Sequence, residues 1–230
     1  MRVVFRRGDD ETLPTALFGL ACLIGLVGAF VGLTASSLWI DELFTTWVVG
    51  DDGSVANVAS RAVTDSNPPL YYLVVFFFTR AFGDSDTTFR LFSALCACAA
   101  ILLFVCATAR SFSLPARLFA AALATASTFW FAQSQNARAY ALALLVGTSV
   151  LALSLRLLPR QADTEKISKS TIALLFVALL SLSLLHFYGL LVAVADLICL
   201  AFLVKKRRVT MAALALLLLL LGEAYVTFVL

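Results

Sequence analysis

Long apolar runs separated by short polar segments dominate this chain. Seven runs have the composition of membrane-spanning helices, and they cover Pro14–Leu33, Leu91–Ala109, Leu118–Phe131, Ala139–Leu158, Thr171–Leu185, Tyr188–Val204 and Val209–Leu230. A helix needs about 20 mostly apolar residues to cross roughly 30 Å of hydrocarbon, and most of these runs approach that length. The pattern predicts an all-α fold, a polytopic transmembrane helical bundle of about seven spans.

Composition supports the same interpretation. Hydrophobic residues make up 62% of the chain and charged residues 13%, against about 45–50% and 25% in soluble domains. No internal repeat or linker divides the sequence, so we expect one domain over residues 1–230. Arg2, Arg6 and Arg7 precede the first run as in a signal peptide. That run is too long for one and lacks a small-residue cleavage site, which indicates a retained anchor.

The five cysteines do not indicate chemistry. All lie inside apolar runs, where a free cysteine behaves as a small hydrophobic residue. They are Cys22, Cys96, Cys98, Cys106 and Cys199. We therefore expect neither a cysteine metal site nor a disulfide.

Charge patterning predicts the orientation of the bundle. The first outer loop begins after residue 33 and extends through about residue 90, and its first part is acidic. If Pro68–Phe82 stays at the outer surface, 13 of the 17 Lys and Arg residues lie on the cytoplasmic side, as the positive-inside rule requires. If it spans, only 6 do. The segment has 15 residues and opens with two prolines, so we expect an interfacial helix. The alternative is a short span with an irregular charge pattern.

Polar residues gather in four places that this topology puts on the outer side. They are Asp41 and Glu42, Asp65 to Asn67, the stretch from Gln133 to Tyr140 that contains Arg138, and His186 with Tyr188 and Gly189. Ionisable groups near lipid are costly and tend to be functional. The pattern therefore predicts a site at the outer membrane surface.

Each of these residues also has a structural interpretation. Asp41 and Glu42 suit the start of a helix over Asp41–Val48, where acids are favoured. Arg138 suits an interfacial anchor whose stem reaches along apolar surface, and His186 suits a structural role near a helix end. Asp196 lies inside an apolar run, where pairing with a neighbouring helix would satisfy its carboxylate. The order of the clusters, more than any one of them, favours function.

That order resembles the family C glycosyltransferases, in particular the branch that contains family 39, the protein mannosyltransferase-like enzymes, and lipopolysaccharide glycosyltransferases. The segments that carry the resemblance are Trp39-Ile40-Asp41-Glu42, Asp65-Ser66-Asn67-Pro68-Pro69-Leu70-Tyr71-Tyr72, Arg90-Leu91-Phe92-Ser93-Ala94-Leu95, Gln133 to Tyr140, and His186-Phe187-Tyr188-Gly189. Asn67 and Asn136 stand where the family commonly has His and Glu. Relatives usually continue after the seventh helix, so the resemblance covers the module that carries the catalytic loop.

The resemblance implies an inverting transferase that moves a sugar from a polyprenyl-phosphate donor to an acceptor hydroxyl on a glycan, lipid or protein. Asp41 is the expected general base, with Glu42 beside it as the second catalytic residue. Asp65, Asn67, Arg138, Tyr140 and His186 are the expected substrate-binding residues. Arg138 is suited to the phosphate, because a guanidinium binds phosphate by charge-assisted hydrogen bonds. Glu42, Asp65 and His186 are candidate ligands for Mg²⁺, Mn²⁺ or Zn²⁺.

The same resemblance predicts a multi-pass plasma-membrane protein whose active site faces the extracytoplasmic side, with no nucleic-acid partner. Two alternatives stay open. One is a non-catalytic membrane protein that binds polyprenyl phosphate. The other is a small transporter or scaffold, although a transporter typically has an inverted repeat and interrupted helices at the midplane.

Overall fold

The computed structural model describes residues 12–50, 53–65, 67–158 and 168–229. Helices make up the ordered elements in these ranges and no strand occurs there, which confirms the all-α fold class. The α-helices are α1 Thr12–Gly28, α2 Ile40–Val49, α3 Val55–Ala62, α4 Leu70–Phe82, α5 Asp86–Ala107, α6 Leu114–Thr125, α7 Thr128–Ser134, α8 Tyr140–Leu157, α9 Lys169–Ser183, α10 Phe187–Leu203 and α11 Arg208–Val229. Two 3-10 turns, η1 Thr108–Arg110 and η2 Lys205–Arg207, follow α5 and α10.

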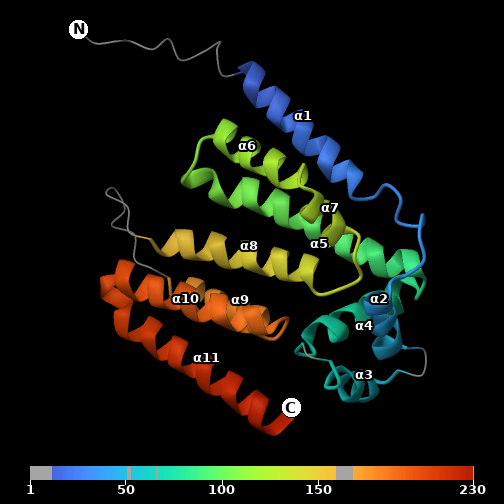
Figure 1. Cartoon of the computed structure of the whole chain (residues 1–230). Coiled ribbons are helices and arrows are strands. Elements are labelled where there is room, and N and C mark those ends of the chain that lie inside the picture. The colour runs from blue at the N-terminus through green and yellow to red at the C-terminus, as the bar shows by residue number, and fades with distance from the viewer. Residues whose placement is uncertain (1–11, 51–52, 66, 159–167, 230) are drawn as a thin grey trace.

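The long helices lie side by side in a tall stack (Figure 1). From α1 the packing runs through α6, α5, α8, α9, α10 and α11. The short helices α2, α3 and α4 gather at one end of this stack, against the start of α5. This end, defined here as the loop end, also receives the start of α8 and the turn between α9 and α10.

Three helical segments are long and apolar enough to cross a membrane by length and composition. They are Asp86–Arg110, Tyr140–Leu157 and Lys205–Thr227. The other apolar helices, α1, α4, α6, α9 and α10, have 17 residues or fewer. These lengths support a membrane protein, whereas the predicted number of seven spans stays a prediction.

Exposed apolar side chains support contact with lipid. Successive leucines of α11, Leu219, Leu220 and Leu221, are all exposed, and so are Leu20 and Leu23 of α1. Soluble monomers rarely expose contiguous apolar patches above a few hundred Å². A bundle in lipid has no such restriction, because the lipid tails are as apolar as leucine.

Two predicted runs are shorter as helices than the sequence pattern indicates. The run Leu118–Phe131 is not one helix, because α6 ends at Thr125 and Ser127 caps α7 by accepting a hydrogen bond from the backbone N of Trp130 at 3.0 Å. The run Pro14–Leu33 is helical only as far as Gly28, and Gly32 follows with a φ of 82° that favours glycine. In both places local turn chemistry ends the helix although the residues remain apolar.

Two hydrophobic cores lie along the stack. The first joins α1, α2, α3, α4, α5, α6 and α7 with the start of α8 and with Leu185 of the turn before α10, and the second joins the end of α8 with α9, α10 and α11. Ala143 and Val146 of α8 pack against both cores. Within the second half, Ser154 donates a hydrogen bond to Asp196 at 2.9 Å, which confirms the predicted pairing of Asp196 with a neighbouring helix.

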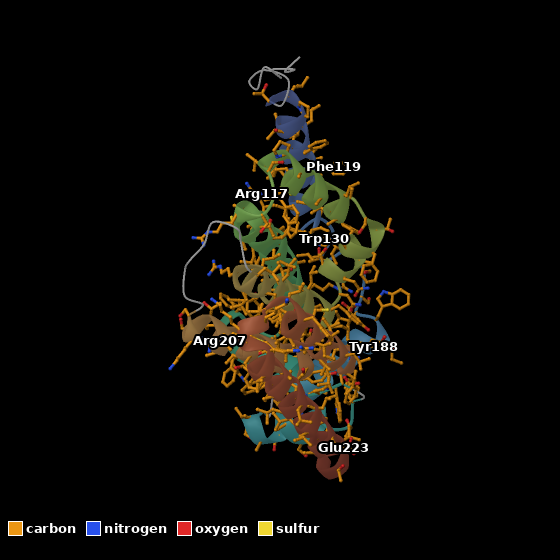
Figure 2. All side chains as sticks on the ribbon, turned by 90° about the vertical axis from the view of Figure 1, so that its left-hand side faces the viewer. Arg117, Phe119, Trp130, Tyr188, Arg207 and Glu223 are labelled. Carbon is orange, nitrogen blue, oxygen red and sulfur yellow. The ribbon has the colours of Figure 1, made fainter. Side chains whose placement is uncertain are left out.

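Basic turns occupy the end of the stack opposite the loop end. The turns η1 and η2 both lie there (Figure 1). Figure 2 looks at the bundle from that side and labels Arg117 of α6 and Arg207 of η2 on it. Acidic Glu223 lies toward the other end of α11 and is exposed. The two ends of the bundle therefore differ in charge.

Candidate functional site

Glu42 is a buried structural carboxylate at the loop end. Its Oε1 accepts hydrogen bonds from Arg90 Nε at 3.1 Å and from the backbone N of Ala137 at 2.9 Å. Its Oε2 accepts from Arg90 Nη2 at 2.8 Å and from the backbone N of Trp39 at 2.9 Å. The bond from Trp39 caps the N-terminus of α2, as the capping interpretation predicts for an acid there.

Arg90 completes this cluster from the first turns of α5. Besides Glu42, its guanidinium donates to the backbone carbonyls of Leu33, Ser36 and Ser37 at 3.0, 2.7 and 3.0 Å. Burial alone would raise the pKa of Glu42, but hydrogen bonds from Arg90, Ala137 and Trp39 lower it. The pair therefore stays ionised and ties the segment after α1 to α2, α5 and the turn before α8.

Three further hydrogen bonds fix the turn between α7 and α8. Thr45 of α2 donates to the carbonyl of Ala137 at 2.9 Å, and Ser93 of α5 donates to that of Asn136 at 2.7 Å. Gln135 donates to the carbonyl of Val31 at 2.6 Å. A turn held from three sides gives Arg138, which comes next in the chain, a defined position.

Arg138 lies at the centre of a second network. Its Nη1 donates to the hydroxyl of Tyr72 at 3.2 Å and to the carbonyl of Asp41 at 3.3 Å, and its Nη2 lies 3.6 Å from Asp65 Oδ2. Tyr72 in turn donates a short hydrogen bond to Asp65, and the side-chain amide of Asn67 donates to the same oxygen at 3.4 Å. The network joins α2, α4, the segment before α4 and the start of α8.

Asp41 has a different environment from its neighbour Glu42. Its side chain is exposed, and no contact within the described residues occupies its carboxylate. The backbone of Asp41 touches the guanidinium of Arg138. The structure thus puts an accessible carboxylate beside the Arg138 network and keeps the adjacent acid buried.

His186 caps the N-terminus of α10. Its Nδ1 accepts a hydrogen bond from the backbone N of Tyr188 at 3.2 Å, and its ring stacks on that of Tyr188 at 5.1 Å. Burial, followed by the positive charge of Arg138, lowers the pKa of His186, whereas Asp65 acts in the opposite direction. A neutral imidazole that accepts at Nδ1 carries its proton on Nε2, so His186 has one further donor.

These residues surround one small pocket at the loop end. All five predicted substrate-binding residues line it, and so do two tyrosines of α4 and Ala139. The lining side chains that carry polar groups are Asp65, Asn67, Tyr71, Tyr72, Arg138, Tyr140 and His186. They come from α4, the segment before it, the start of α8 and the start of α10. Segments distant in the sequence therefore meet where the resemblance predicts a substrate site.

The predicted metal ligands do not fit a shared metal site. Within the described residues, no group of three or more His, Cys, Asp or Glu side chains could hold an ion. Glu42 is engaged by four donors, and it does not line the pocket that contains Asp65 and His186. We therefore derive no step through a metal, and metal dependence stays a prediction from the resemblance.

Sequence reasoning missed three residues that organise the site. Arg90 belongs to a quoted motif, but its partner Glu42 is 48 positions away and only the fold brings them together. Tyr71 and Tyr72 also belong to a quoted motif, yet the sequence assigned neither of them a role. The signal available was an arginine at the start of an otherwise apolar helix, because such a charge needs a buried partner.

Comparisons with protein-family models, curated proteins and solved structures found no match for this chain.

Proposed function

We propose that this chain is a membrane glycosyltransferase that moves a sugar from a polyprenyl-phosphate donor to an acceptor hydroxyl at the extracytoplasmic membrane surface. The observation that carries the proposal is the pocket at the loop end. It gathers Asp65, Asn67, Arg138, Tyr140 and His186 from three parts of the sequence. The motif order described above supports a transferase over other uses of such a pocket.

Arg138 is proposed to bind the phosphate of the donor. Its Nη1 is engaged by Tyr72 and by the carbonyl of Asp41. Within the described residues, its Nε donates no hydrogen bond and its Nη2 has only the 3.6 Å contact with Asp65. A guanidinium has five N–H donors, so a fixed Arg138 retains donors for a phosphate oxygen.

Asp41 is proposed to act as the general base. It takes the proton from the acceptor hydroxyl as that oxygen forms a bond to the anomeric carbon. The bond between the anomeric carbon and the phosphate oxygen breaks, and polyprenyl phosphate leaves with the electron pair. Attack from the face opposite the phosphate inverts the configuration. Charge that develops on the leaving phosphate is stabilised by Arg138.

The proposed arrangement in the membrane has seven spans. They are α1, α5, the broken pair α6 and α7, α8, α9, α10 and α11, while α2, α3 and α4 form the outer loop with its interfacial helices. This arrangement puts the pocket at the extracytoplasmic surface and the basic turns η1 and η2 in the cytoplasm, consistent with the positive-inside rule.

The test is donor binding by the purified protein in nanodiscs, with a polyprenyl-phosphate-linked hexose as the probe. We expect Arg138→Lys to weaken binding about tenfold or more, because lysine lacks the planar fork that grips phosphate. Arg80→Lys is the matched control. Arg80 also lies at the loop end, but it lines a separate groove beside Gly83 and Asp84.

Equal donor binding by the wild type and Arg138→Lys would remove Arg138 from the site. An interfacial anchor acts through its charge and its long stem, both of which lysine keeps, so unchanged insertion together with unchanged donor binding in Arg138→Lys would identify Arg138 as an anchor. If the wild type binds no polyprenyl-phosphate probe, the transferase proposal fails and a scaffold or transporter is favoured.

A further inference from the structure

Tyr71 is the unusual polar group of the pocket. Its side chain is 2% exposed, and no group in the described part of the chain lies at hydrogen-bond distance from its hydroxyl. The Thr45 hydroxyl is the nearby side chain that could pair with it and acts to lower the pKa of Tyr71, but Thr45 already donates to the carbonyl of Ala137. Leaving a buried polar group unpaired costs about 1–3 kcal/mol, so such groups are rare and require an explanation. One recognised explanation is a ligand that is present only part of the time.

The neighbouring tyrosine shows the contrast. Tyr72 is equally buried, but its hydroxyl donates to Asp65 and accepts from Arg138. The two rings meet edge to face with centroids 5.4 Å apart, so both hydroxyls belong to the same wall of the pocket. Tyr72 is committed to holding the pocket together, whereas Tyr71 is not.

The surroundings of Tyr71 favour a hydrogen-bond donor for an anion. Burial raises the pKa of Tyr71, so the hydroxyl keeps its proton. Arg138 and His186 line the same pocket, and both have N–H donors that no described residue accepts from there. A hydroxyl, a guanidinium and an imidazole N–H line a cavity of about 10 Å³, which has room for about one water-sized group. These donors therefore suit a single phosphate oxygen rather than a whole phosphate group.

We propose that the Tyr71 hydroxyl donates a hydrogen bond to the phosphate of the lipid-linked donor and so assists Arg138 in binding it. This inference rests on the proposed function. It assigns to the first tyrosine of the pair a ligand-binding role that the second does not share. Binding of the donor would give a partner to a hydroxyl that has none at hydrogen-bond distance among the described residues.

We expect Tyr71→Phe to weaken donor binding without lowering stability. In the free protein the variant removes an unpaired buried hydroxyl, so we expect its melting temperature to stay the same or to rise. With the polyprenyl-phosphate-linked hexose, we expect binding about tenfold weaker, since one hydrogen bond to a charged group is lost. Both quantities are measured on the full chain in nanodiscs.

Tyr225→Phe is the matched control. The Tyr225 hydroxyl is also buried and unpaired among the described residues, but Tyr225 belongs to α11 and is not among the residues that line the pocket. This variant should bind the probe as the wild type does.

Equal binding by wild type and Tyr71→Phe would overturn the role of Tyr71, and so would equal losses in the two tyrosine variants. A lowered melting temperature in Tyr71→Phe would assign the hydroxyl to the fold instead. A wild type that binds no probe contradicts the proposed function itself, so the two failures are distinguishable.

Discussion

At the scale of single residues, the site depends on neighbours in the sequence that have opposite surroundings. Asp41 is exposed and its carboxylate is available, whereas Glu42 is buried and accepts four hydrogen bonds. The sequence predicts an acidic pair at the start of a helix, but not which of its members is buried. That distinction depends on Arg90 and Ala137, which only the tertiary fold brings to Glu42.

Asp41→Asn tests the proposed base. The substitution keeps the size of the side chain and removes its basicity, so we expect transfer to be about 10²–10⁴-fold slower. Donor binding should persist, because the contact of Arg138 with residue 41 uses the backbone carbonyl. Single-turnover transfer from a labelled polyprenyl-phosphate hexose measures the rate.

Glu223→Gln is the control for this substitution, since Glu223 is an exposed acid on α11. It should transfer at the wild-type rate. Near-normal turnover by Asp41→Asn would show that Asp41 is not the general base and serves only as an acid at the start of α2.

At the scale of elements, the pair of Glu42 and Arg90 joins segments that have little else in common. It connects the segment after α1, the start of α2, the start of α5 and the turn before α8. Removing one partner of such a pair leaves an uncompensated buried charge, which is strongly destabilising. The pair thus holds the turn that positions Arg138.

Glu42→Gln should lower the free energy of unfolding by about 3–5 kcal/mol, because Arg90 keeps its charge without a counter-ion. The free energy of unfolding of the wild type should also depend on pH through the Glu42 carboxyl group. The folded state lowers the pKa of Glu42 from its ordinary value of 4.5. The stability that the ionised carboxylate provides is therefore fully present above pH 4.5 and is lost as the pH falls through the lowered pKa.

Thermal unfolding in detergent between pH 7 and pH 3 measures both effects. Glu42→Gln should lack the part of the acid-induced loss that comes from this carboxylate. If Glu42→Gln is as stable as the wild type at pH 7, the pair of Glu42 and Arg90 does not stabilise the fold as described.

Element boundaries were the part of the fold that hydrophobic pattern alone could not predict. The apolar run that contains Ala126 and Ser127 continues across a helix break, since a serine cap requires only one side chain and does not interrupt hydrophobicity. The helical interpretation of Pro68–Phe82 was correct, with α4 beginning at Leu70 after the two prolines. The backbone N of Leu70 donates to the carbonyl of Leu184 at 3.3 Å, a long-range contact that no local pattern encodes.

At the scale of the whole molecule, the bundle has one end with short helices and one end with basic turns (Figure 1). Charge counting on the sequence predicted that Arg61, Arg80, Arg90 and Arg138 share a side. The structure gathers these four at the loop end through α3, α4, α5 and the turn before α8.

Cysteine labelling in intact cells tests this orientation. In a background with the five native cysteines replaced by alanine, Ser54→Cys at the start of α3 should react with an impermeant maleimide. Ser111→Cys, after η1 at the opposite end, should react only when the membrane is opened. The charge asymmetry of the two ends is the physical reason.

Labelling of Ser111→Cys from outside would overturn the orientation and the number of spans together. Permeabilised cells provide the control that both cysteines are chemically accessible.

The division of the molecule into two cores has a thermodynamic consequence. Ala143 and Val146 of α8 pack against both cores, and Leu185 of the turn before α10 belongs to the first core, so α8 and this turn join the two halves. The pocket also takes Arg138 and Tyr71 from one half and His186, the cap of α10, from the other. By linkage, a ligand that contacts both sides adds its binding free energy to the cooperativity between the halves. A ligand held by both sides would therefore be released when either half unfolds, so its binding stabilises the two halves together.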